Sequence, residues 1–105
     1  CGLGALQAAK ENKVWGIGVD ADQRYLGPHI MTSALKRVDK SVMDLTALAK
    51  NGTLKTGKDY VFNLKNGGQD VGKVSAKCKC SAFVKQMNAL KPLIIKGKIK
   101  IPAKL

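Results

Sequence analysis

The sequence predicts an α/β fold built on a parallel sheet, and two neighbouring segments carry that prediction. Residues 14–19 form a short apolar run bounded by turn signals, which is typical of a buried strand. Residues 4–12 precede it as a predicted helix in which apolar residues recur three positions apart. A helix, a brief turn and a buried strand are the components of a parallel sheet covered by helices.

The middle of the chain predicts a second strand and the clearest helix. Residues 21–29 form a loop with the breaker pair Gly27-Pro28, and residues 30–35 suit a short strand. Apolar residues then follow helical spacing at Val38, Val42, Leu45 and Ala49. Gly52 should lie just past the end of this helix, where glycine is favoured.

The last part of the chain predicts a further strand, a turn and a final helix. Residues 60–64 alternate as a strand, and residues 65–68 form a tight turn or loop. Ser81 is a good N-cap for a helix over residues 82–96. Pro92 lies inside that span and should kink or divide the helix.

The length and the charge limit the classes of function. A chain of 105 residues fits one domain at most, and it begins as though already within a helix, so we expect a fragment. The net charge is +12, and residues 51–105 hold twelve lysines against two acidic residues. All basic residues of that half are lysine, without arginine for bidentate contacts to bases or phosphates. This favours a lysine-rich face in solvent over a nucleic-acid site, with a basic polyanion-binding module as an alternative.

The sequence offers no clear catalytic or metal site. Three cysteines give no disulfide framework, and a bridge between Cys78 and Cys80 would be strained, so we expect free thiols there. The single histidine, His29, follows a proline in a loop and is expected to be exposed. It cannot complete a nucleophilic triad, and no set of four zinc ligands is present. We therefore expect no enzyme, no metal and no cofactor.

Two carboxylates mark the candidate site. The first predicted strand stops at Asp20, and Asp22 follows with one residue between them. Ligands of open α/β sheets bind at the carboxyl ends of the strands, so Asp20 is placed to accept hydrogen bonds from sugar hydroxyls. The alternative is that Asp20 only caps the turn that follows it. The distance between the Asp20 and Asp22 carboxylates is not fixed across a turn, so the catalytic carboxylate pair of a glycosidase is not indicated.

Four motifs appear in one order along the chain. They are Gly2-x-Gly4 opening a helix, Gly18-Val19-Asp20-x-Asp22-Gln23, Thr32-Ser33-x-x-Lys36-Arg37-Val38-Asp39, and Lys65-x-Gly67-Gly68. Together they resemble the C-terminal part of the basic membrane lipoprotein family, the substrate-binding proteins of ABC importers that take up purine nucleosides. The sequence departs from the family at Gln69-Asp70, where glycine and apolar residues are usual, and at Cys78-Lys79-Cys80.

The resemblance implies a fold and a set of ligand contacts. The fold would be a three-layer parallel-sheet lobe of a type I periplasmic-binding protein, with residues 1–105 part of the C-terminal lobe and the N-terminal lobe absent. Asp20 would accept hydrogen bonds from the ribose hydroxyls. Lys36 would reach the ribose oxygens or pair with Asp20. Gly2 would offer a backbone N–H at a helix start.

Plainer roles stand beside these contacts. Lys36 could be a solvated lysine, and Gly2 could serve close packing of a helix on a strand. Asp22 is expected to form the turn or to support a neighbouring ligand contact.

The resemblance also implies partners and a location. These are a purine nucleoside or related small molecule, an ABC permease and, for the parent protein, a lipid anchor on the outer side of a bacterial cell membrane. Nucleic acid is not among the expected partners. We attribute Cys1 to the point where the chain begins. The alternative function is the ligand-sensing domain of a regulator with the same fold.

Overall fold

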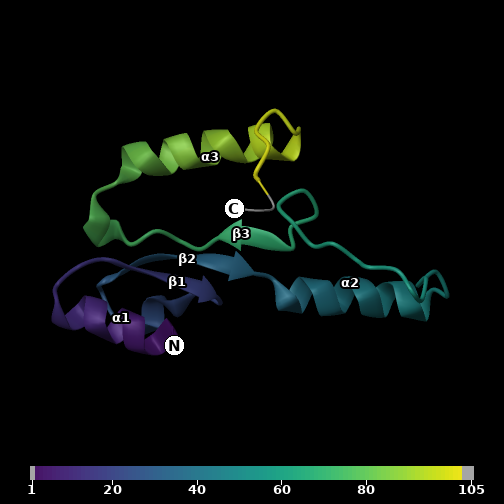
Figure 1. The fold of residues 1–105 in the computed structure, drawn as a ribbon, viewed down its shortest axis with the longest axis horizontal. Coiled ribbons are helices and arrows are strands. Elements are labelled where there is room, and N and C mark those ends of the chain that lie inside the picture. The colour runs from purple at the N-terminus through teal and green to yellow at the C-terminus, as the bar shows by residue number, and fades with distance from the viewer. Residues whose placement is uncertain (1, 103–105) are drawn as a thin grey trace.

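Residues 2–102 are described by the computed structural model, and Cys1 and residues 103–105 lie outside them (Figure 1). The elements in chain order are α1 (Gly2–Glu11), β1 (Gly16–Asp20), the 3₁₀ helix η1 (Gln23–Leu26), β2 (Ile30–Lys36), α2 (Val38–Lys50), β3 (Gln69–Val71), the 3₁₀ helix η2 (Ala76–Cys78) and α3 (Ser81–Ile95). The first two helices and first two strands lie close to the predicted positions.

The sheet has the strand order β1-β2-β3 (Figure 1). Strands β1 and β2 are parallel, with Asp20 opposite Leu35, which confirms the parallel pair that the sequence predicts. Strand β3 runs antiparallel to β2 and sets Gln69 opposite Lys36. The last residues of β1 and β2 and the first residue of β3 therefore lie at one edge of the sheet, which is the edge that matters for the site.

Helix α1 and the 3₁₀ helix η1 cover one face of β1. A side chain on Gly16 would lie 2.8 Å from Leu6 Cδ2 of α1, and one on Gly18 would lie 2.8 Å from Gln23 Cβ of η1. Both glycines are buried, so the chain can bring helix and strand together only where no side chain intervenes. Within the described residues, Leu6 and Ile30 form the buried apolar core.

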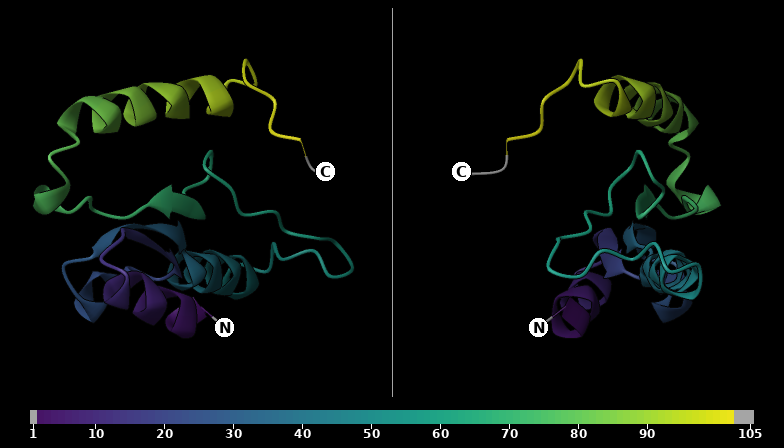
Figure 2. Two further views of the ribbon diagram at one scale, coloured as in Figure 1. Left: turned by 60° about the vertical axis from the view of Figure 1, so that its left-hand side comes forward. Right: turned by 90° about the vertical axis from the view of Figure 1, so that its right-hand side faces the viewer.

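The opposite face of β1 carries apolar side chains that the described residues leave uncovered. Ile17 is 54% exposed and Val19 is 59% exposed. Helices α2 and α3 bury no residue, and Figure 2 shows α3 standing apart from the sheet in both views. The buried apolar core of the described residues therefore lies on the α1 side of the sheet, next to the beginnings of β1 and β2.

The predicted strand over residues 60–64 is absent, and this segment is a loop. Side chains bind the backbone locally: Asn66 Oδ1 accepts a hydrogen bond from Asn63 N at 2.8 Å, and Asn66 Nδ2 donates one to Val61 O at 2.8 Å. Such bonds offer the backbone an alternative to a sheet ladder. The strand forms at β3 instead, where it can pair with β2.

Helix α3 passes through Pro92 without dividing. It begins at Ser81, with Cys80 as an N-cap whose side chain makes no capping bond, so the prediction of Ser81 as the cap was one residue off. The helical bonding resumes after the proline, since Lys96 N donates to Pro92 O at 3.0 Å. Proline removes one donor, and the helix tolerates that loss here.

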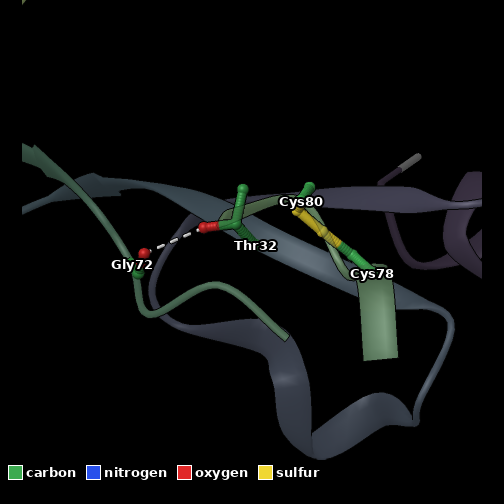
Figure 3. The surroundings of a disulfide bond; sticks show 4 residues. All are labelled: Thr32, Gly72, Cys78 and Cys80. Carbon is green, nitrogen blue, oxygen red and sulfur yellow. Dashed lines mark hydrogen bonds between the residues drawn. A yellow bond between two sulfur atoms is a disulfide. The ribbon is translucent and has the colours of Figure 1, made fainter. Parts of the chain in front are cut away.

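A disulfide joins Cys78 and Cys80, so the expectation of free thiols was wrong (Figure 3). Lys79 adopts the left-handed conformation, with φ of 50° and ψ of 30°. This curls the backbone and brings the two Cα atoms to 5.2 Å, within the range that a disulfide requires. The segment before it is tied to the sheet by Thr32, whose Oγ1 donates to Gly72 O at 2.9 Å (Figure 3).

His29 is half-buried, whereas the sequence predicted an exposed side chain. Both of its ring nitrogens are buried and have no hydrogen-bond partner within the described structure. The imidazole packs against the turn at Gly27, where a side chain would lie 3.0 Å from His29 Nδ1. The glycine of the breaker pair therefore makes room for the ring.

Candidate ligand-binding site

The candidate site lies where the parallel strands end. Because β1 and β2 run the same way, Asp20 and Lys36, their last residues, lie at one edge of the sheet. Helix α1 runs back along β1, so its N-terminal end, which begins at Gly2, lies at the same edge (Figure 1). The topology therefore gathers three of the four predicted site residues at one end of the sheet.

A hollow of about 390 Å³ opens at this edge. It is lined by Val19, Asp20, Ala34, Leu35, Lys36, Leu64, Gln69, Asp70 and Val71. Apolar residues from all three strands line it, together with two acidic residues, Asp20 and Asp70, and one basic residue, Lys36. Such a lining suits a small molecule with an apolar body and hydroxyl groups that need both acceptors and donors.

Asp20 occupies a special backbone conformation at the end of β1. Its φ is 71°, which is uncommon for a residue other than glycine, although aspartate tolerates it better than most. The chain turns sharply there, since Ala21 N donates to Val19 O at 3.0 Å. Asp20 is exposed, so its carboxylate is accessible at the edge.

Lys36 lines the same hollow as Asp20. In the described residues no ion pair joins the two, so pairing with Asp20, one of the two roles that the resemblance implies for Lys36, is not seen. The next residue, Arg37, is engaged elsewhere: its Nη2 lies 2.7 Å from Asp39 Oδ2. The Arg37 guanidinium lowers the pKa of Asp39 to about 2. Lys36 remains the basic group that lines the hollow.

Gly2 lies at the site edge but outside the lining of the hollow. A side chain at Gly2 or Gly4 would meet nothing within 4 Å, so neither glycine serves close packing of the helix on the strand. That role belongs to Gly16 and Gly18. In β1, glycine alternates with apolar residues, and this pattern is the signal that could have identified Gly16 and Gly18.

Asp22 forms the turn after Asp20 and does not line the hollow. It is the N-cap of η1, accepting a hydrogen bond from Arg24 N at 3.2 Å. Its Oδ2 also pairs with Arg24 Nη2 at 2.8 Å, and this guanidinium lowers the pKa of Asp22. The sequence predicts that Asp22 either forms the turn or supports a neighbouring ligand contact. The structure places it in the turn-forming role.

Gln69 and Asp70 line the hollow, and sequence reasoning did not propose them. Their signal was the departure from the resembled family at these two positions. Asp70 Oδ1 lies 2.5 Å from Lys91 Nζ of α3, and this ammonium lowers the pKa of Asp70. Gln69 is opposite Lys36 in the β2–β3 pair, where side chains of paired residues lie about 5 Å apart at Cβ.

The polar residues of the hollow define the contacts that it can make. Within residues 2–102 no three histidine, cysteine, aspartate or glutamate side chains are grouped to hold a metal ion. The arrangement at the strand ends can accept hydrogen bonds at Asp20 and donate them at Lys36 and Gln69. This is the chemistry of binding a polar small molecule.

Comparison with protein families identifies one match over nearly the whole chain. The family described as ABC transporter substrate-binding protein PnrA-like matches residues 1–104. The structure is similar to the crystal structure of a transcriptional activator of the comK gene from Bacillus halodurans, with a TM-score of 0.79, 23% identity, and coverage of 89% of this chain and 32% of that one. At that identity the likeness shows the fold alone. The two matches confirm the expected α/β fold of the type I periplasmic-binding kind.

Two characterised relatives share more of the sequence. The chain is 37% identical to the ABC transporter nucleoside-binding protein BmpA of Lactococcus lactis subsp. cremoris, covering 95% of this chain and 31% of that protein. It is 35% identical to basic membrane protein D of Borreliella burgdorferi, covering 96% of this chain and 31% of that protein. The chain therefore spans about a third of the length of these relatives.

Proposed function

This chain belongs to the PnrA-like family of ABC transporter substrate-binding proteins, and we propose that it supplies the ribose-binding edge of a purine-nucleoside site. The family is one of solute-binding proteins and not of enzymes. In the proposed protein, residues 1–105 are part of the C-terminal lobe. A second lobe closes over the ligand from the other side, and the closed form is presented to an ABC permease.

The juxtaposition of Asp20 and Lys36 in one hollow is the observation that carries the proposal. A carboxylate accepting from two hydroxyls makes charge-assisted hydrogen bonds, which are stronger than bonds between neutral groups. Lys36 donates to ribose oxygens from the neighbouring strand. The name of the Lactococcus lactis relative, a nucleoside-binding protein, supports the same class of ligand.

The other two predicted residues take different places in the proposal. Gly2 begins α1 at the edge of the sheet, where its backbone N–H points out of the helix and no side chain blocks a ligand. Asp22 acts through the turn that it caps and not by contact with ligand.

The proposed location is the outer side of a bacterial cell membrane, with the parent protein held there by a lipid anchor. The name of the Borreliella burgdorferi relative, basic membrane protein D, supports this location. Across residues 2–102 no helix has the length and apolar character needed to cross a membrane.

The test uses a full-length chimera in which this chain replaces the matching segment of the Lactococcus lactis relative. Calorimetry with adenosine and guanosine compares the chimera with Asp20→Asn, and we expect Asp20→Asn to weaken binding about 10- to 100-fold, as the loss of a charged hydrogen-bond partner does. Asp59→Asn is the matched control, since Asp59 is exposed and lies outside the hollow. A folded chimera that binds nucleosides equally well with Asp20→Asn contradicts the proposed role of Asp20.

The 105-residue chain alone provides a second test. Because it offers one side of the proposed cleft, we expect it to bind adenosine weakly or not at all. Tight binding by the chain alone would show that a second lobe is unnecessary.

A further inference from the structure

A chain of hydrogen bonds runs beneath Asp20 from β1 through η1 to β2. Val19 N donates to Gln23 Oε1 at 2.9 Å, and Gln23 N donates to Ser33 Oγ at 3.0 Å. Ser33 is 0% exposed, so its hydroxyl is a fixed point in the core. The strand residue before Asp20 is thereby tied to a buried group on the neighbouring strand.

These bonds close the turn in which Asp20 stands. The turn leaves β1 at Val19 and ends at Gln23. The Gln23 side chain holds its first end through Val19 N, and the Gln23 backbone amide holds its second end through Ser33 Oγ. Within the turn, Asp22 is occupied with Arg24. Asp20 is the acidic residue of this turn that the structure directs to the hollow, and its φ of 71° is a conformation that the surrounding contacts must maintain.

Gly18 shows how closely the parts of this cluster fit. A side chain at Gly18 would lie 2.5 Å from Ser33 Oγ and 2.8 Å from both Cβ and Oε1 of Gln23. Real Cβ atoms do not approach other atoms so closely, so glycine is required for Gln23 to reach across β1. Gly18, Gln23 and Ser33 therefore act as one packed unit.

We infer that Gln23 and Ser33 are positioning residues for the ligand contact at Asp20. This inference rests on the proposed function, because it assigns them a role in ligand binding through Asp20. Neither side chain lines the hollow, so neither is expected to touch ligand. Their contribution is preorganisation: a carboxylate held in its bound position before the ligand arrives loses less conformational freedom on binding.

Two variants of Gln23 separate the hydrogen bond from the bulk of the side chain. Gln23→Glu keeps an oxygen that can accept from Val19 N, whereas Gln23→Met keeps the length and removes the acceptor. In the chimera, we expect Gln23→Met to weaken adenosine binding about tenfold, within the range of coupled neighbouring residues, and Gln23→Glu to stay close to the parent. Ser33→Ala, which removes the acceptor for Gln23 N, is expected to act in the same direction.

The choice of ligand distinguishes positioning from general damage. Asp20 is proposed to bind ribose hydroxyls, so the affinity ratio of adenosine to 2′,3′-dideoxyadenosine measures its contact. If Gln23 acts through Asp20, Gln23→Met lowers that ratio and has little further effect when combined with Asp20→Asn. An equal loss for both nucleosides, or full additivity with Asp20→Asn, overturns the inference.

The remaining outcomes separate the inference from the proposed function. If Asp20→Asn leaves the ratio unchanged, the proposed function fails. If Asp20→Asn lowers it but Gln23→Met and Ser33→Ala do not, the inference fails alone. Amide hydrogen exchange of the 105-residue chain gives an independent measure: Val19 N–H should exchange faster in Gln23→Met than in Gln23→Glu, and equal rates contradict the hydrogen bond.

Discussion

Lys91 Nζ of α3 lies 2.5 Å from Asp70 Oδ1 of β3, and this ion pair links the last helix to the sheet. Val71 N also donates to the same carboxylate oxygen at 2.8 Å. Between the two elements lies a hollow of about 600 Å³, lined by residues of the 71–76 segment and of α3, including Lys91. The position of α3 over β3 therefore depends on few contacts, and the ion pair is one that can be removed by mutation.

The pH dependence of α3 should follow Asp70. The Lys91 ammonium lowers the pKa of Asp70, so the pair contributes stability above the ordinary aspartate pKa of about 3.9 and loses it as the pH falls through the lower value in the folded state. Both groups are partly exposed, so the effect on the free energy of unfolding should be below about 1 kcal/mol. Amide chemical shifts of α3 should move as the pH is lowered from 6 to 3, and Asp70→Asn should remove most of that response. Asp59→Asn is the control.

Gly18→Ala should destabilise the chain by about 1–3 kcal/mol, the usual cost of overpacking. The added methyl group would lie 2.5 Å from Ser33 Oγ, and Ser33 is fully buried. Urea unfolding followed by far-ultraviolet circular dichroism measures the change. Gly4→Ala is the matched control, because its methyl group meets nothing within 4 Å and alanine favours the helix. If the two substitutions have the same effect, the packing at Gly18 is not as the structure describes.

The disulfide between Cys78 and Cys80 should protect the chain from trypsin at Lys79. Lys79 is exposed, but the short disulfide ring holds its backbone in the left-handed conformation, which a protease cannot bind in extended form. In a Cys1→Ser background, alkylation without reduction should add nothing to the mass, and reduction should allow two additions. Reduction should also speed cleavage after Lys79 and not after Lys58, an exposed lysine in the loop before β3. Two alkylated cysteines before reduction would show that the thiols are free.

The sequence predicted the elements that carry local signals and missed those that depend on distant contacts. Helix α2 was predictable because its apolar periodicity agrees with the position of Gly52, which has φ of 67° and lies two residues past the end of the helix at Lys50. Strand β3 was not, because its three residues have no alternation of their own and become a strand by pairing with β2. The alternating residues 60–64 misled because neighbouring asparagines bind their backbone.

The candidate site divides in the same way. Asp20 and Lys36 were predictable as residues that follow or end parallel strands, since the topology sets such ends at one edge. Gln23 and Ser33 were named within motifs, but their hydrogen bonds cross between two strands and a turn. Only the structure shows that they meet beneath Asp20. The close packing that the sequence offered as a role for Gly2 occurs at Gly18 instead. The position of Gly2 at a helix start did not predict the tight contact at Gly18.

Salt should have little effect on nucleoside binding by the chimera. Adenosine is uncharged, and its proposed contacts at Asp20 and Lys36 are short hydrogen bonds, so raising the salt concentration from 50 to 500 mM should change its affinity by less than about threefold, in contrast to the steep loss that polyanion binding shows. The same chain carries twelve lysines in residues 51–105, which makes electrostatic binding to single-stranded DNA the appropriate comparison. We expect any DNA binding to disappear over this range while adenosine binding persists. If adenosine binding falls with salt as steeply as DNA binding does, adenosine binds to the basic surface and not to the strand-end hollow. That result would contradict the nucleoside site and support the alternative of a polyanion-binding module.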